Sequence, residues 1–309
     1  MSVALLFPGQ GAQRPGMLQA VPDSPAAGAV IAEARSACTE LRVTGDLDNP
    51  GQDTVTTQLS LVVTGAACGR ALVDDAGLTP AFVAGHSVGA FAAAVVAGVL
   101  TLREALMAVC ERGESMRAVC SGRPWGMAAI TGLRPIVAQK LAEKATTPKE
   151  PVWLANVNSA NQTVLGGTIP ALTAAEQLAC RDGARSFERL DVEVASHGPL
   201  QEPTSQALRS CLSALPRREP AIRYITNVGG RSANSAAAVH DDLASSVSRP
   251  VRWYDGIRLM SELGITCTVE STPGHTLTRL AAAAVPTLTA IALDEQGLRN
   301  AVAIARRHL

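Results

Sequence analysis

The segment Gly-His-Ser-Val-Gly at residues 85–89 places a serine between two glycines, the form typical of a nucleophile on a sharp strand-to-helix turn. The motif alone occurs often by chance, so its flanks decide its meaning. Apolar residues 81–84 precede it and predict a buried strand, and small residues 90–97 follow it and predict a helix. The glycines let the backbone turn tightly, and Ser87 then lies at a helix N-terminus, where the helix dipole favours developing negative charge. We predict that Ser87 is a catalytic nucleophile.

A serine nucleophile needs a base, and the chain has five histidines. A single histidine is more often a surface or core residue than a base, so position must decide. His86 is adjacent to Ser87 and should point elsewhere, whereas His197 lies in a Ser-His-Gly-Pro loop that should face a cleft between two domains. No acid-bearing loop precedes His197, so we expect a Ser-His dyad, oriented by a backbone carbonyl, rather than a Ser-His-acid triad. The remaining candidates are His240, His275 and His308, the last at the frayed end of the chain.

Arg112 is a third candidate for the site. Val109, Arg112 and Met116 fall on one face of a predicted helix, and Gly113 opens space beside the arginine. Most helical arginines are solvated, but a cation set among apolar residues needs an anionic partner, because an unpaired buried charge is costly. That partner is either a structural carboxylate or the carboxylate of a ligand.

A glycine-rich loop, Pro-Gly-Gln-Gly-Ala-Gln at residues 8–13, follows the first predicted strand at residues 3–7. Proteins of the α/β class bind ligands at such strand ends. The glycine spacing and the lack of a following Lys-Ser or Lys-Thr argue against a phosphate loop. A ligand-binding loop and a plain tight turn both remain open on this pattern.

The order of predicted elements indicates two domains. Strands and helices alternate in the first and last thirds, which predicts a mostly parallel sheet with helices on both faces. Residues 126–190 instead follow a β-α-β-β-α-β order, the ferredoxin-like pattern. We expect an α/β protein with a large domain at residues 1–124 and 193–309 and an inserted small domain at residues 125–192. The predicted helices lie at 26–41, 56–72, 135–145, 169–181, 200–215 and 253–263. Further helices should begin at the capping pair Thr101 and Glu104 and at the segment 273–275, and a final helix should end the chain. The later strands are expected at 126–131, 152–156, 162–165, 186–190, 222–226, 267–269 and within 285–291.

Composition excludes several classes of function. The 309 residues are 47% hydrophobic and carry no net charge, and only 3% are aromatic, which argues against a nucleic-acid partner. The seven cysteines are scattered and form no Cys-x-x-Cys pair, so no metal site or disulfide framework is indicated. The first residues lack a basic segment, and the longest apolar run, residues 90–100, is too short to cross a bilayer. We expect a cytoplasmic protein without a membrane partner.

These segments, taken in order, resemble the malonyl-CoA:acyl carrier protein transacylase family. The likeness extends over nearly the whole chain and implies a hydrolase-like large domain plus a ferredoxin-like small one. It includes Phe-Pro-Gly-Gln-Gly-Ala-Gln at 7–13, Gly-His-Ser-Val-Gly at 85–89, Arg-Gly at 112–113, Gly-Met-Ala-Ala-Ile at 126–130, Asn-Val-Asn-Ser at 156–159, Ser-His at 196–197, Arg-Pro-Val-Arg-Trp at 249–253 and Glu-Ser-Thr-Pro-Gly at 270–274.

The resemblance implies a role for each matching position. Ser87 resembles the nucleophile of the family, His197 the base, and Arg112 the clamp on the malonyl carboxylate, which its planar fork can hold at two points. The backbone N–H groups of Gln10 and Val88 resemble the oxyanion hole. The family implies malonyl-CoA as substrate, an acyl carrier protein as partner and no permanently bound cofactor, with the coenzyme A thioester entering as substrate.

The chain departs from the fatty-acid enzymes at three positions. Their serine motif usually continues Gly-Glu-Tyr, whereas here it continues Gly-Ala-Phe at 89–91. Ser196 stands where they usually have a phenylalanine, which should leave more room in the acyl pocket, and Ser246 replaces a glutamine whose backbone carbonyl orients the histidine. The first two departures look most like the malonyl-transferring epsilon subunit of bacterial malonate decarboxylase, which loads the prosthetic-group thiol of a small carrier subunit.

We therefore expect an acyltransferase that works through a malonyl-Ser87 ester, most similar to that epsilon subunit. Three alternatives stay open: a transacylase of fatty-acid synthesis, a serine thioesterase with the same residues, and a non-catalytic subunit that docks a carrier protein. Intact Ser87, His197 and Arg112 argue against the last.

Overall fold

Two sheets organise the computed structural model, which describes residues 2–51, 53–192 and 194–309. The larger sheet has six strands in the order β10-β9-β1-β2-β7-β8, all parallel to their neighbours except β8, which pairs antiparallel with β7. This is the mostly parallel α/β sheet expected from the sequence. Its strands are β1 (Ser2–Phe7), β2 (Phe82–Gly85), β7 (Arg223–Ile225), β8 (Ser232–Ala233), β9 (Ile265–Glu270) and β10 (Thr289–Ala292).

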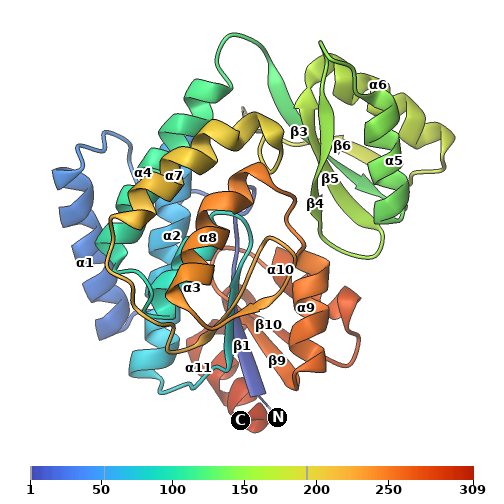
Figure 1. Cartoon of the computed structure of the whole chain (residues 1–309). Coiled ribbons are helices and arrows are strands. Elements are labelled where there is room, and N and C mark those ends of the chain that lie inside the picture. The colour runs from blue at the N-terminus through green and yellow to red at the C-terminus, as the bar shows by residue number, and fades with distance from the viewer. Residues whose placement is uncertain (1, 52, 193) are drawn as a thin grey trace.

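Helices cover both faces of this sheet (Figure 1). Successive side chains of β1 point to opposite faces of the sheet. Val3, Leu5 and Phe7 belong to one buried cluster, and Ala4 and Leu6 belong to another. Such two-sided burial explains why the parallel strands read as continuous apolar runs. The cluster on the first face also includes residues of α1 (Pro25–Glu40), α2 (Thr54–Arg70), α3 (Gly89–Val96), α4 (Leu102–Val119), α7 (Glu202–Ser213), α8 (Ala236–Ser245) and α11 (Leu293–Ala305), and the cluster on the second includes residues of α9 (Trp253–Glu262) and α10 (Thr276–Ala284).

Local sequence signals account for the start and the burial of the helices that carry the site. The capping box at the start of α4 is present, because Glu104 Oε2 accepts from Thr101 N–H at 2.8 Å and Thr101 Oγ1 accepts from Glu104 N–H at 3.2 Å. Helix α3 is buried along its whole length, as its uniformly apolar residues require. The site therefore rests on elements fixed by the core.

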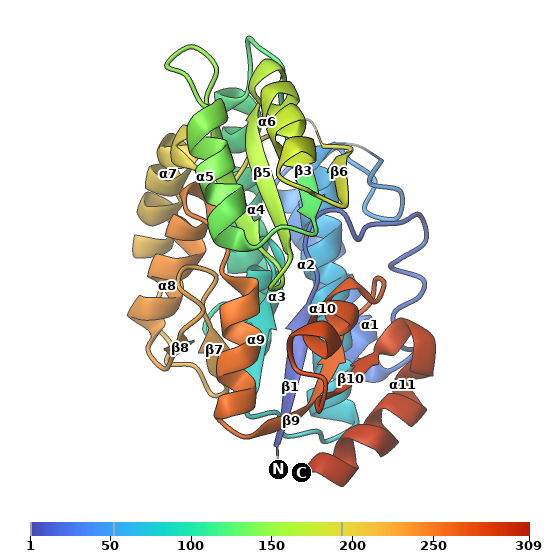
Figure 2. The ribbon, with the colours of Figure 1, turned by 90° about the vertical axis from the view of Figure 1, so that its right-hand side faces the viewer.

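The small domain is a four-stranded antiparallel sheet in the order β4-β5-β3-β6. Its chain order is the expected β-α-β-β-α-β pattern. One face packs against the two helices, while Met127, Ala155 and Val164 form a separate small cluster on the other. The domain stands beyond the carboxyl ends of the large sheet (Figure 2). Its elements are β3 (Trp125–Thr131), α5 (Pro135–Ala145), β4 (Val152–Val157), β5 (Gln162–Thr168), α6 (Ile169–Arg181) and β6 (Ser186–Arg189).

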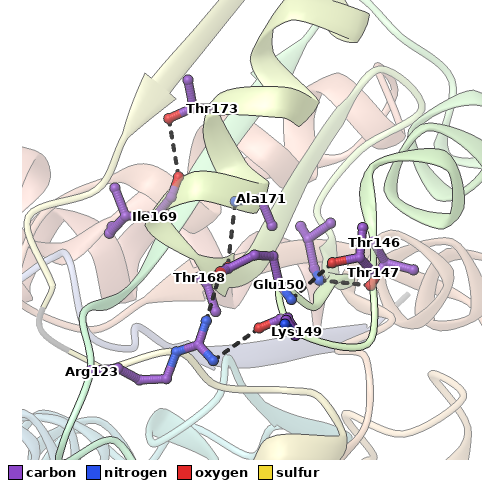
Figure 3. A network of polar contacts seen from close by, with 10 residues as sticks. Arg123, Thr146, Thr147, Lys149, Glu150, Thr168, Ile169, Ala171 and Thr173 are labelled. Carbon is purple, nitrogen blue, oxygen red and sulfur yellow. Dashed lines mark hydrogen bonds and ion pairs between the residues drawn. The ribbon is translucent and has the colours of Figure 1, made fainter.

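Arg123 ties the segment that enters the small domain to the turn before β4 (Figure 3). Its guanidinium donates to the Lys149 carbonyl at 3.0 Å and pairs with Glu150 at 2.6 Å. Thr147 Oγ1 accepts from the Glu150 N–H at 3.0 Å and so holds the same turn. Exposed pairs of this kind add little stability, but together they fix the path of the connection.

The observed bounds differ from the expected ones mostly by a few residues. Among the described strands and α-helices, β8 and α8 were not expected; α8 begins where Ser235 Oγ accepts from the Ala238 N–H at 3.3 Å. The expected large-domain start at residue 1 and domain boundary at residue 193 lie outside the described residues, and the domain limits stay predictions. Within the described ranges, none of the helices combines the length and hydropathy needed to cross a bilayer.

Candidate active site

A cavity of about 250 Å³ is lined by residues of both domains. Ser87, Arg112 and His197 reach it from the large domain, and the open face of the small sheet contributes residues such as Met127 and Val164. The expected cleft between the domains is therefore present, and the three residues singled out for their chemistry meet in it. The part of the chain that the structure describes has no cluster of His, Cys, Asp or Glu that could hold a metal ion.

Ser87 sits on the turn between β2 and α3 with a backbone φ of +54°. That left-handed conformation is strained for a residue with a side chain, and close packing enforces it. A Cβ at Gly85 would lie 2.1 Å from the Gly89 carbonyl carbon, and a Cβ at Gly89 would lie 2.2 Å from the Phe7 carbonyl oxygen. Both glycines of the motif are thus required for the close approach of helix and strand.

His197 faces the serine. Its Nε2 lies 2.8 Å from Ser87 Oγ, and its Nδ1 lies 2.6 Å from the carbonyl oxygen of Ser246. Because a carbonyl can only accept, Nδ1 carries the proton and Nε2 presents its lone pair to the serine. Burial lowers the pKa of His197 to about 3, and the positive charge of Arg112 acts in the same direction. The histidine is therefore neutral at physiological pH, as a base must be.

Arg112 extends from α4 into the same cavity and is only 2% exposed. It donates to Gln58 Oε1 at 2.6 Å and to Ser87 Oγ at 3.1 Å. No carboxylate within residues 2–51, 53–192 and 194–309 forms an ion pair with it. Burial lowers the pKa of Arg112 to about 10, so it stays charged at neutral pH. Of the two partners expected from the sequence, a structural carboxylate is not found among the described residues.

Two backbone amides are available to stabilise negative charge next to Ser87. The amide of Ser87 itself is occupied, because it donates to Asn227 Oδ1 at 2.9 Å. Those of Gln10 and Val88 have no acceptor within the described parts of the protein. Gln10 follows β1, Val88 precedes α3, and β1 and β2 are neighbours in register up to Phe7 and Gly85. Two unpaired amides beside the serine are what the predicted oxyanion hole at Gln10 and Val88 requires.

The other predicted positions are also accounted for. Ser196 is buried, lines the cavity and donates to Met127 Sδ at 3.4 Å. His86 turns away from Ser87, as expected, and its Nε2 lies 3.1 Å from Asn158 Oδ1. The remaining histidines lie outside the cavity lining: His240 is buried on α8, His275 pairs with Glu295, and His308 contacts Thr266.

Sequence reasoning missed three polar residues that support the site. Gln58 holds Arg112, Asn227 holds the Ser87 amide, and Trp153 Nε1 donates to the Ser196 carbonyl at 3.0 Å. Of the three, only the position of Asn227 could have been recognised from the sequence. It directly follows a predicted strand of a parallel sheet, and ligand-binding residues are common at that end of such strands. Gln58 lay in a helical pattern of otherwise ordinary residues, and Trp153 lay inside a predicted strand.

Comparisons with known proteins agree with this geometry. Residues 4–298 match the family of acyl transferase domains. The malonyl CoA-acyl carrier protein transacylase of Bacillus subtilis (strain 168) is 31% identical over 283 residues, which cover 90% of this chain and 89% of the relative. The structure of the malonyl CoA-acyl carrier protein transacylase from Coxiella burnetii superposes with a TM-score of 0.91 at 30% identity, covering 99% of this chain and 98% of the other.

A further similar structure is a malonyl-transacylase in complex with a type II polyketide synthase acyl carrier protein. It has a TM-score of 0.90 at 29% identity and covers 98% of this chain and 100% of the other. Both structural matches span the large and the small domain.

Proposed function

We propose that this chain, which belongs to the malonyl-CoA:acyl carrier protein transacylase family of acyl transferases, moves a malonyl group from coenzyme A to the prosthetic-group thiol of an acyl carrier protein. Ser87 is the nucleophile and His197 the base. Arg112 binds the free carboxylate of the malonyl group, and the Gln10 and Val88 amides bind the oxyanion. The residue geometry and the similarity to the transacylases support these assignments together.

The first half-reaction acylates Ser87. His197 Nε2, 2.8 Å from the serine oxygen, takes the hydroxyl proton as Ser87 Oγ attacks the thioester carbonyl. The carbonyl oxygen becomes an oxyanion between the two free amides. The carbon–sulfur bond then breaks, His197 returns the proton to the departing coenzyme A thiolate, and a malonyl-serine ester remains.

The second half-reaction runs the same steps in reverse with a new thiol. The carrier thiol loses its proton to His197 and attacks the ester, and Ser87 leaves with that proton restored. The Ser246 carbonyl keeps the imidazole in the tautomer that both halves need, because it accepts from Nδ1 throughout. Product release therefore returns the free enzyme unchanged.

The observation that carries the proposal is the buried cation in the acyl pocket. Arg112 contacts the nucleophile oxygen at 3.1 Å and has an amide oxygen, but no carboxylate among the described residues, as its other partner. A substrate carboxylate would compensate this charge and bind in two places. Malonyl is a short acyl group with a free carboxylate at its far end, whereas acetyl has none.

Arg112→Ala tests this assignment. We expect it to reduce kcat/KM for malonyl-CoA by about 100-fold or more, on the order of 3 kcal/mol, and to change acetyl transfer far less. Arg117→Ala on the same helix is the matched control, since Arg117 is 60% exposed and pairs with Asp53 outside the cavity. A mutant that still strongly prefers malonyl over acetyl would mean that another group holds the carboxylate.

The identity of the carrier is a separate question. The relatives favour an acyl carrier protein of fatty-acid or polyketide synthesis as acceptor. The Gly-Ala-Phe continuation at 89–91 and Ser196 favour a second candidate, the carrier subunit of a malonate decarboxylase. Malonyl-loaded enzyme should be mixed with both holo-carriers, and transfer followed by intact mass. The preferred acceptor is the one with the higher kcat/KM, and hydrolysis to malonate without transfer to either would instead indicate a thioesterase.

A further inference from the structure

The strained conformation of Ser87 needs support beyond the glycines of its turn. A residue with φ near +54° returns to a relaxed conformation unless its neighbours prevent it. Glycine packing prevents the helix from moving away, but it leaves open where the Ser87 amide points. In this structure one side chain fixes that direction.

Asn227 binds both sides of the turn. Its Oδ1 accepts from the Ser87 N–H at 2.9 Å, and its Nδ2 donates to the Gly85 carbonyl at 3.0 Å. One planar amide thus bridges the residues on either side of His86. Asn227 is 3% exposed and lies two residues beyond the end of β7, next to the end of β2. The same side chain therefore sets the distance between the end of the strand and the nucleophile.

Asn227 is itself held on its backbone. Its N–H donates to Asp242 Oδ2 at 2.9 Å, and its carbonyl accepts from the Arg252 N–H at 2.8 Å. Asp242, 2% exposed on α8, also accepts from the Val228 N–H at 2.8 Å and from the Tyr224 hydroxyl at 2.8 Å. Three donors converge on one buried carboxylate, and such a satisfied network is rigid. The support of the turn thus extends from α8 through β7 to the nucleophile.

We propose that Asn227 is a positioning residue for the acyl-transfer reaction, anchored by Asp242, and that it directs the Ser87 amide away from the cavity. The amides left facing the substrate are then those of Gln10 and Val88. Without Asn227 the Ser87 amide is free to rotate, and the serine oxygen loses its alignment with His197. The inference rests on the proposed function for Ser87 and His197 but does not depend on which acyl group is carried.

The test compares Asn227→Ala with Ile225→Ala. Ile225 is a buried core residue at the end of β7, two positions before Asn227, so its truncation should destabilise the protein without removing a hydrogen bond of the turn. We expect Asn227→Ala to slow acylation from malonyl-CoA and acetyl-CoA by the same factor, about 100-fold, because a small misplacement of a reacting atom has effects of that size. KM for malonyl-CoA should change less than about threefold, whereas Ile225→Ala should retain its acylation rate constant.

A fluorophosphonate that labels activated serines gives a readout independent of malonyl recognition. Asn227→Ala should be labelled more slowly than wild type and Ile225→Ala at the wild-type rate. The inference is overturned if the fluorophosphonate labels both variants at the same rate. It is also overturned if the acylation rate constant falls no more in Asn227→Ala than in Ile225→Ala. Wild type that reacts with the fluorophosphonate but not with malonyl-CoA would contradict the proposed function instead.

If Asn227→Ala does not fold, Tyr224→Phe supplies a graded version. It removes the Tyr224 hydroxyl donor from Asp242 and leaves the Asn227 side chain in place. We then expect a fall of about three- to tenfold in the acylation rate constant, with KM unchanged. A folded Tyr224→Phe protein with the wild-type rate constant contradicts the anchoring role of Asp242.

Discussion

The proposed nucleophile, Ser87, and the proposed base, His197, share one backbone feature but are held by different means. Within the described chain, Ser87 and His197 are the two residues of the site, apart from glycines, with positive φ, at +54° and +59°. Ser87 is confined by the close packing of the glycines in its own motif and by the side chain of Asn227, which follows β7. His197 is held in a loop by contacts from distant segments. Its N–H donates to the Val247 carbonyl at 2.7 Å, and the preceding carbonyl accepts from Trp153 of the small domain at 3.0 Å.

Ser87 and His197 differ in how far along the chain the residues that hold them lie. The turn at Ser87 is encoded locally, because the glycines that it needs flank the serine in sequence, and Asn227 adds one distant contact. The geometry at His197 depends on the small domain and on the segment 246–248 after α8. Movement of the small domain should therefore disturb the base more than the nucleophile.

The largest difference between the two residues should come from substituting the glycines near them, Gly89 near Ser87 and Gly198 next to His197. Gly89→Ala should reduce acylation by about 1,000-fold or more, because its Cβ would meet the backbone at Phe7, which cannot yield. Gly198→Ala should have a smaller effect, since its Cβ would meet Trp153 Nε1 at 2.0 Å, and a side chain can shift, at the cost of its bond to the Ser196 carbonyl, where backbone cannot. Acylation rates and melting temperatures of both variants measure this. Equal losses in the two would contradict the view that the nucleophile has the more rigid support.

The pH dependence of stability should separate the base from the nucleophile. The pKa of His197 is about 3 in the folded protein and about 6.5 when unfolded. Between these values only the unfolded chain binds the proton, so wild type loses stability as pH falls below 6.5, by about 1.4 kcal/mol per unit. This contribution is fully present above pH 6.5.

His197→Gln should lack that slope, and Ser87→Ala should retain it, because serine does not titrate. The quantity to measure is therefore the difference in unfolding free energy between wild type and His197→Gln. From pH 8 to pH 5 this difference should shift by about 2 kcal/mol in favour of the variant. Parallel curves would show that the histidine is protonated at a normal pKa in the folded protein.

The smallest expected effect concerns the residue before the base. Ser196 lines the cavity, and a phenylalanine there should crowd the α-carbon of the acyl group. Wild type should load methylmalonyl at a measurable rate, and Ser196→Phe should reduce that loading selectively, by an amount in the lower part of the ~1–3 kcal/mol range for one methylene. The malonyl-to-methylmalonyl ratio of kcat/KM for both proteins checks this. An unchanged ratio would place the selectivity elsewhere, for instance near Phe91.

The same contrast explains which parts of the structure could be predicted. The turn at Ser87, the α4 capping box and the order of most elements along the chain depend on local patterns, so sequence reasoning found them, whereas the order of strands within each sheet depends on long-range pairing and was not predicted. The meeting of Arg112 with Ser87 followed only from the resemblance to a family. Asn227, Gln58 and Trp153 act through side-chain contacts between segments about 43 to 140 residues apart, which no local pattern encodes. Helix α8 was missed for a different reason, since its alanine-rich sequence lacks a clear apolar period.

Intact-mass measurement of the protein after incubation with malonyl-CoA tests the central claim most directly. The account predicts that wild type gains the mass of one malonyl group, that Ser87→Ala gains none, and that the adduct is lost when a holo-carrier protein is added. Equal labelling of Ser87→Ala, or no adduct on the wild type, would contradict it.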